Sequence, residues 1–200
     1  ALESIKIPEN VTEIKYQAFA WCGNLKSIDI PNTVTTIEAE TFRGCTNLET
    51  ITIPASVSNF GDKVLLNSGV KSVWIPSEDG SEKTAALVAS KTDVNIYIKD
   101  DAENLSFYRG NVIADLGHYS ADNDVKLEDG SVTLTNVSGT INAGEQTITL
   151  PNAAGITASI GTDGNITVNV PSAITVGEEE YPYGARIDIL PDGEIEVTAN

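Results

Sequence analysis

Few residues of this chain could do chemistry. Cys22, Cys45 and His118 are the only thiols and the only imidazole in 200 residues. His118 lies in the polar segment GHYSADND, and no GxSxG motif supplies a nucleophile for it. Two cysteines without a pair of histidines make no zinc site. A pair of carboxylates would need a cleft, which no motif marks. The sequence therefore predicts no enzyme, no catalytic residue, no metal and no cofactor.

Two acidic clusters could offer oxygen ligands to calcium. The first runs from Ala121 to Asp124 and continues to Glu128 and Asp129, and the second is Glu178 to Glu180. Neither has the glycine and the terminal glutamate of an EF-hand at the required offsets. We therefore interpret both clusters as solvated turns.

Any function other than catalysis must depend on the secondary-structure elements that position these residues. The first half of the chain is built from a sequence repeat. LESIKIPENVTEIKYQAFAWCGN aligns with LKSIDIPNTVTTIEAETFRGCTN, with LETITIPASVSNFGDKVLLNSG and with VKSVWIP. The repeats step by 23, 23 and 22 residues. A unit of this length cannot close its own core, so the units must stack as a solenoid.

Each unit begins with a short strand that ends at a proline, and these strands should pair in a parallel sheet. We expect eight apolar residues of these strands to be buried, with equivalent residues of neighbouring repeats paired in register. They are Ile5, Ile7, Ile28, Ile30, Ile51, Ile53, Val73 and Ile75. Val11, Ile14 and the Ala18-Phe19 pair, with their equivalents, should fill the interior from the opposite wall. Phe19 and Phe42 should stack in one column.

The pattern LxxIxIPxxVxxIxxxAFxxCxx resembles that of the BspA-like leucine-rich repeat family, whose members are mostly bacterial and protozoan surface proteins. The resemblance covers residues 1 to 76, with a closing cap to about residue 98. The third repeat departs from it at Val64, Leu65 and Ser68, as expected of a terminal unit. The resemblance implies an extracellular or cell-surface protein that binds macromolecules, often in adhesion.

Cys22 and Cys45 occupy the same position in adjacent repeats, which places their Cα atoms about 4.8 Å apart. That distance permits a disulfide, but the parallel direction of the side chains disfavours one. In the resembled family this is an interior ladder position. We expect two buried free thiols.

The chain should form two domains, a solenoid with its cap over residues 1–98 and an all-β domain over residues 105–200. The cap would be a short helix at residues 81–90 and a strand at 94–98, and the polar run KDDAEN at 99–104 would be the boundary. Asp-Gly turns at 129–130, 163–164 and 192–193 predict hairpins. Seven to nine short strands predict a β-sandwich or Greek-key module.

The net charge of −17 and a pI near 4.2 disfavour nucleic acid as a partner, because a phosphate backbone needs clustered basic residues. No apolar run is long enough to insert in a membrane. The chain has no methionine and opens within a repeat, so we expect a signal peptide or anchor to lie outside it.

Three functions remain, namely a surface-exposed binding or adhesion module, a structural spacer of a larger adhesin, and the solenoid and β-module of a glycan-active enzyme. For the first, the partner would be a protein or glycan on a host or bacterial surface. The outward side chains of the strands should form its contact stripe, with binding assigned to Lys6, Asp29, Thr50, Thr52, Ser72 and Trp74. Trp74 is either a binding hot spot or a residue covered by the cap or the β-module.

Overall fold

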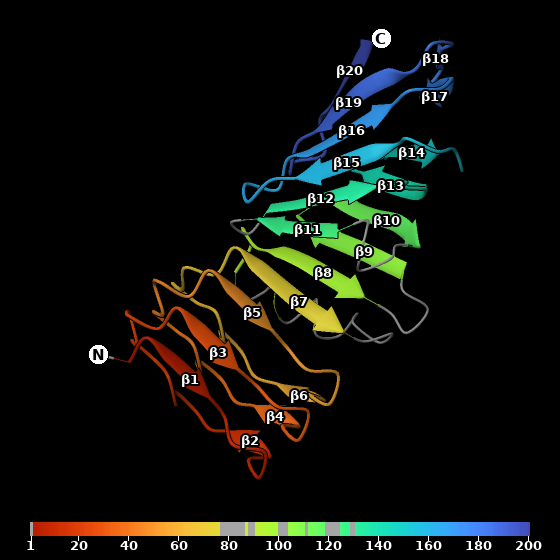
Figure 1. Ribbon diagram of the computed structural model, residues 1–200. Coiled ribbons are helices and arrows are strands. Elements are labelled where there is room, and N and C mark those ends of the chain that lie inside the picture. The colour runs from red at the N-terminus through yellow and green to blue at the C-terminus, as the bar shows by residue number, and fades with distance from the viewer. Residues whose placement is uncertain are drawn as a thin grey trace. The chain divides into compact units, whose positions relative to one another are not determined.

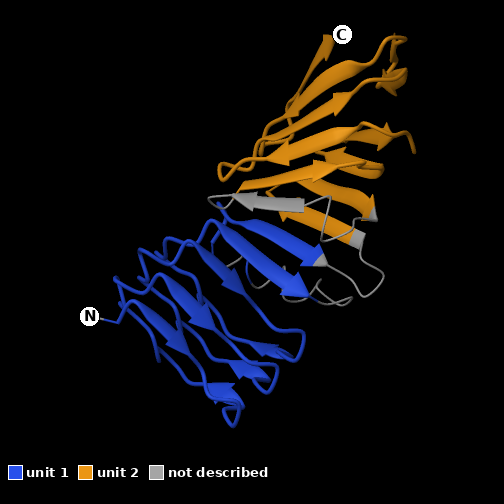
Figure 2. Cartoon of the chain, viewed as in Figure 1, with its two compact units in different colours: residues 1–99 blue, residues 100–200 orange. Residues whose placement is uncertain are grey.

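The computed structural model describes residues 2–76, 87, 91–99, 104–110, 112–118, 125–128 and 131–200. All strands among them belong to two compact units, Ala1–Lys99 and Asp100–Asn200 (Figure 2). The first unit is a β-solenoid of about four turns over residues 4–98, and the second consists of antiparallel sheets. The predicted boundary at 99–104 lies largely outside the described residues.

The solenoid is built on a ladder of parallel strands, which lie side by side in Figure 1. They are β1 (Ser4–Lys6), β3 (Ser27–Asp29), β5 (Thr50–Thr52), β7 (Ser72–Pro76) and β8 (Asn95–Lys99). β1 pairs with β3, and β7 pairs with both β5 and β8. Ile5 is opposite Ile28, and Ile51 is opposite Val73. The register predicted from the repeat is therefore confirmed.

A second parallel ladder, which the sequence did not predict, forms the opposite wall. Its strands are β2 (Glu13–Ile14), β4 (Thr36–Ile37) and β6 (Asn59–Phe60). The remaining segments of these repeats are turns rather than helices. Of the capping helix expected at 81–90, only Leu87 is described. It is helical and buried, and its carbonyl accepts a hydrogen bond from the Lys91 N–H at 2.9 Å.

The solenoid core follows the repeat closely. The rings of Phe19 and Phe42 stack with centroids 5.7 Å apart and planes within 8°, as predicted. Six of the eight residues predicted for the core are buried, and Ile5 and Ile28 are half-buried. Both of these lie in β1 and β3, at the end of the described ladder, where the stack covers them less completely. Burial thus increases from β1 toward β7.

The repeats also share two left-handed backbone positions. One is occupied by Gln17, Glu40 and Lys63, with φ between 55° and 57°, and the other by Trp21, Gly44 and Asn67, with φ between 56° and 72°. Glycine and asparagine suit this conformation, whereas tryptophan rarely adopts it. The equal spacing shows that each repeat turns in the same way.

The second unit is all-β, as predicted, and has twelve strands among its described residues instead of seven to nine. Four are antiparallel neighbours in the order β9 (Asn104–Arg109), β10 (Val112–His118), β13 (Gly139–Ala143) and β14 (Gln146–Leu150). Six form a sheet in the order β11 (Val125–Glu128), β12 (Ser131–Thr135), β15 (Thr157–Ile160), β16 (Ile166–Val170), β19 (Ala185–Ile189) and β20 (Ile195–Ala199). The hairpin of β17 (Ile174–Val176) and β18 (Glu179–Tyr181) forms a two-stranded sheet of its own, and β17 lies beside β14.

The predicted Asp-Gly hairpins are present. Gly164 and Gly193 have φ of 85° and 93°, at the turns that join β15 to β16 and β19 to β20. β11 pairs with β12 across residues 129–130, which themselves lie outside the described residues. Two further hairpins, β13–β14 and β17–β18, are each closed by a two-residue Gly-Glu turn.

Candidate functional site

The outward side chains of the first ladder form one stripe along the solenoid. Alternation along each pleated strand places every second side chain on this face. We call this face the outer stripe, and its members are Ser4, Lys6, Ser27, Asp29, Thr50, Thr52, Ser72 and Trp74.

The first three rows of the outer stripe are exposed. Ser4 is opposite Ser27, and Thr50 and Thr52 follow in β5, so four of the six residues in these rows carry a small hydroxyl group. Lys6 and Asp29 lie on neighbouring strands, with their charged atoms 3.7 Å apart. This ion pair is exposed and contributes little to stability, but it neutralises both charges on the stripe.

Charges beside the outer stripe are paired in the same way. Lys26 contacts Glu3 at 2.9 Å, and Lys71 contacts Glu49 at 3.1 Å, in each case across one repeat. The stripe and this flanking row together carry three lysines and three carboxylates. A chain with a net charge of −17 thus has an electrically balanced face along its solenoid.

The outer stripe becomes covered at its β7 end. Ser72 is buried, as is Asn95, its neighbour in register on β8, so the expected outward exposure of Ser72 is not found. Trp74 is half-buried and stacks on the buried Tyr97, with ring centroids 4.7 Å apart. The accessible part of the stripe therefore runs from Ser4 to Thr52, with Trp74 at its margin.

Sequence reasoning missed two exposed aromatic residues on the turns of the first repeat. Trp21 is 64% exposed in spite of its left-handed φ of 62°. Its ring lies against Gly44, and the guanidinium of Arg43 is 5.3 Å from the ring centroid. Tyr16 is also exposed. The sequence did contain a signal for the exposure of Trp21, because this tryptophan holds the repeat position that Gly44 and Asn67 occupy in the next two repeats.

Arg43 belongs to a polar cluster beside Trp21. Its guanidinium donates to Glu40 at 2.8 Å, and the side-chain amide of Gln17 donates to the same carboxylate at 2.8 Å. These two hydrogen bonds, the one from Arg43 above all, hold the pKa of the Glu40 carboxyl below its usual range. The cluster fixes the orientation of the cation next to the indole ring.

Both cysteines are free, as predicted. Cys45 is buried, whereas Cys22 is only half-buried. The Cys45 thiol donates to the carbonyl of Phe19 at 3.1 Å. Burial, with a smaller contribution from Cys22, raises the pKa of the Cys45 thiol to about 11, so this sulfur is protonated and unreactive at neutral pH.

The other residues considered for chemistry are described only in part. The His118 side chain, residues 121–124 and Asp129 lie outside what the structure describes, and Glu128 is described only as part of β11. Glu178, Glu179 and Glu180 are exposed, and the Glu179 carboxylate accepts a hydrogen bond from the Tyr181 hydroxyl at 2.8 Å. Within the described ranges, no three His, Cys, Asp or Glu side chains are grouped so as to hold a metal ion. The same residues include no helix long and apolar enough to cross a membrane.

One comparison with known proteins is informative. Residues 1–92 match the family model described as a BspA type leucine rich repeat region. No curated protein and no solved structure is significantly similar to the chain. The match ends within the solenoid.

Proposed function

We propose that this chain, whose residues 1–92 are a BspA-type leucine-rich repeat region, is a non-catalytic binding module of a cell-surface or secreted bacterial protein. Its family is one of surface proteins, and repeat regions of this type are typically non-catalytic. A solenoid suits such a role because stacked repeats present an extended surface for a macromolecular partner.

The charge balance of the outer stripe is the main support for this function. Solubility alone would favour unpaired carboxylates on an exposed face of so acidic a chain. Instead, each lysine of the stripe and its flank is paired with a carboxylate of the neighbouring repeat. A neutral surface rich in hydroxyl groups can be desolvated against a partner without burying an unpaired charge.

The proposed contact residues are Lys6, Asp29, Thr50 and Thr52, with Trp74 at the margin. Ser72 was expected to join them, but it is buried and would contribute only through the position of β7. The partner would be a protein or glycan of a host or bacterial surface. The module would act outside the cell without a cofactor.

Binding of the full 200-residue chain to an array of purified extracellular-matrix glycoproteins and purified glycans tests this function. Saturable binding that changes little with salt supports it, because a balanced face gains little from long-range attraction. A chain that binds none of these probes would instead be a spacer. Binding that disappears at moderate salt would point to the acidic second unit rather than to the stripe.

A further inference from the structure

Trp21 is an exposed aromatic residue that the packing of the solenoid does not explain. Its side chain is 64% exposed, although its backbone is left-handed, with φ of 62°. Bulky residues rarely adopt this conformation, and a backbone held in it is strained. Burial of an apolar ring can offset such strain, but most of this ring is in contact with water. Because burial does not offset the strain, the indole is a candidate for a function in binding.

The exposure of Trp21 belongs to its position in the repeat. Gly44 and Asn67 hold the equivalent position, also with left-handed φ, of 72° and 56°. The third repeat pairs with the second through β6 and with β7 through β5, and Asn67 within it is nevertheless exposed. The same holds for Tyr16, because its equivalent Asp62 is exposed as well. The repeat itself therefore directs these side chains to solvent, within the stack as well as at its end.

Contacts with the second repeat hold the indole in place. Its six-membered ring lies against Gly44, where any side chain would collide with it. The Arg43 guanidinium is 5.3 Å from the ring centroid, and the backbone N–H of Trp21 donates to the Arg43 carbonyl at 2.7 Å. Glu40 fixes Arg43 in turn and also accepts a hydrogen bond from Gln17. The ring is therefore positioned before any ligand arrives, and its open part faces solvent.

The groups beside the ring are polar but electrically balanced. Arg43 is paired with Glu40 at 2.8 Å, and Lys15 with Glu38 at 3.1 Å. Gln17 donates one amide N–H to Glu40, and a glutamine amide has a second donor and an acceptor oxygen besides. The indole is thus flanked by hydrogen-bonding groups without an excess charge.

These features select a neutral sugar as the ligand. The electron-rich face of an indole attracts the weakly positive C–H groups of a pyranose ring, and polar side chains beside it can bind the hydroxyl groups at the edge of the sugar. An anionic glycan would be repelled by a chain with a net charge of −17. A cationic ligand is disfavoured because Arg43 already lies against the same ring.

We propose that Trp21, with Arg43, Glu40 and Gln17 beside it, is a stacking site for a neutral pyranose unit of a glycan. The site lies on the turns of the first two repeats, apart from the outer stripe, and does not depend on binding there. The strained backbone of Trp21 is then retained because it presents the indole to the sugar.

Tryptophan fluorescence tests the site directly. In Trp74→Phe, Trp21 is the only indole of the chain. This variant is titrated with chitotetraose, cellotetraose and lacto-N-tetraose. We expect a saturable shift of the emission to shorter wavelength with at least one of them, because a stacked sugar shields the ring from water. Emission that changes with none of the three would overturn the proposal.

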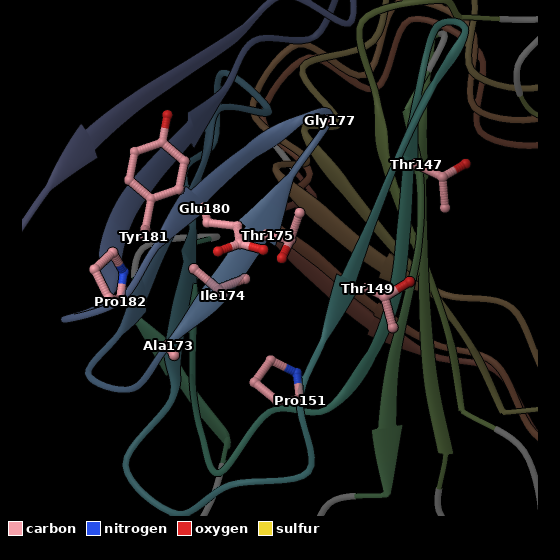
Figure 3. Close-up of a pocket in the computed structure, with 10 residues that line it drawn as sticks. All are labelled: Thr147, Thr149, Pro151, Ala173, Ile174, Thr175, Gly177, Glu180, Tyr181 and Pro182. Carbon is pink, nitrogen blue, oxygen red and sulfur yellow. The ribbon is translucent and has the colours of Figure 1, made fainter.

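Two variants of the full chain locate the sugar. Trp21→Asn introduces the residue of the third repeat, which tolerates left-handed φ, so the melting temperature should stay the same or rise. Calorimetry should show its affinity for the oligosaccharide lowered about tenfold or more. Tyr181→Ala is the control and should leave the affinity unchanged. It removes an aromatic ring from a groove of about 670 Å³ in the second unit, which Figure 3 shows between Thr147 and Thr149 of β14 and the β17–β18 hairpin.

Three results would contradict the assignment. Unchanged affinity in Trp21→Asn would mean that the sugar binds elsewhere. An equal loss in Tyr181→Ala would place it in the groove of the second unit. A lower melting temperature of Trp21→Asn would show that the indole serves the packing of the repeats.

Discussion

The indole of Trp74 and the phenol ring of Tyr97 are stacked, with centroids 4.7 Å apart and planes within 13° of parallel. The two residues are opposite each other on β7 and β8, so the stack continues the ladder of the solenoid. Tyr97 is buried and Trp74 only half-buried. The pair favours a packing role for Trp74 at the β7 end of the outer stripe, and its role in binding stays a prediction.

Replacing Trp74 by alanine should lower the free energy of unfolding by about 1–3 kcal/mol, since the stack and part of the burial are lost. Trp74→Phe keeps an aromatic ring above Tyr97 and should cost less. Urea denaturation of both variants measures the difference. Unchanged stability of Trp74→Ala, together with loss of partner binding, would show that the residue is a hot spot rather than part of the packing.

The burial gradient along the ladder predicts unequal costs for equal truncations. Ile51 is 3% exposed and Ile28 is half-buried, although both hold the same repeat position. Ile51→Ala should cost about 2–5 kcal/mol, and Ile28→Ala clearly less. Denaturation midpoints of the two variants decide this, and an equal or larger cost at Ile28 would contradict the gradient.

Gly23 and Gly69 share a repeat position but differ in their surroundings. A Cβ at Gly69 would lie 2.0 Å from the carbonyl oxygen of Thr46, whereas a Cβ at Gly23 has its nearest neighbour at 3.4 Å. Gly69→Ala should therefore destabilise the solenoid by about 1–3 kcal/mol through overpacking. Gly23→Ala should change the melting temperature little. A tolerated alanine at residue 69 would argue against the close approach of the third repeat to the second.

The Cys45 thiol should make stability depend on alkaline pH. Its folded pKa is raised from 9.0 to about 11, so the unfolded thiol ionises across this window while the folded thiol stays protonated. The unfolded state then binds fewer protons, and stability should fall as pH rises from about 9 to about 11.

Cys45→Ala should show a shallower decline than the parent chain, which urea titrations at several pH values can compare. In the parent chain, iodoacetamide should reach the half-buried Cys22 first. Both thiols should react after denaturation without reductant. Parallel pH profiles of the parent and Cys45→Ala would contradict the raised pKa.

The repeat made much of the solenoid predictable. Equal spacing of Ile5 and Ile28 sets the register of their strands, and the same spacing stacks Phe19 on Phe42. This spacing is a local pattern that each repeat shows again, so it predicts the pairing of the strands without knowledge of the tertiary contacts. The Asp-Gly turns of the second unit were predictable for the same reason, because their chemistry acts over two residues.

The missed features depend on context. β2, β4 and β6 are two residues long, too short to show an alternation of apolar and polar residues. The β17–β18 hairpin turns at Gly-Glu, a weaker signal than Asn-Gly or Asp-Gly. The burial of Ser72 depends on what surrounds β7, which its own strand pattern does not contain. These features depend on tertiary structure. They largely determine which part of the outer stripe is accessible.

Above all, we propose that the outer stripe binds a macromolecular partner. The test uses a glycoprotein or glycan that the full chain binds. The dissociation constant of this ligand is measured for two double variants, Thr50→Arg/Thr52→Arg and Thr12→Arg/Thr35→Arg. The first pair changes the exposed centre of the stripe, and the second adds the same charge at exposed threonines beside the β2–β4 ladder. We expect the first pair to weaken the affinity about tenfold or more and the second pair to leave it unchanged. Equal affinities for both variants would contradict it.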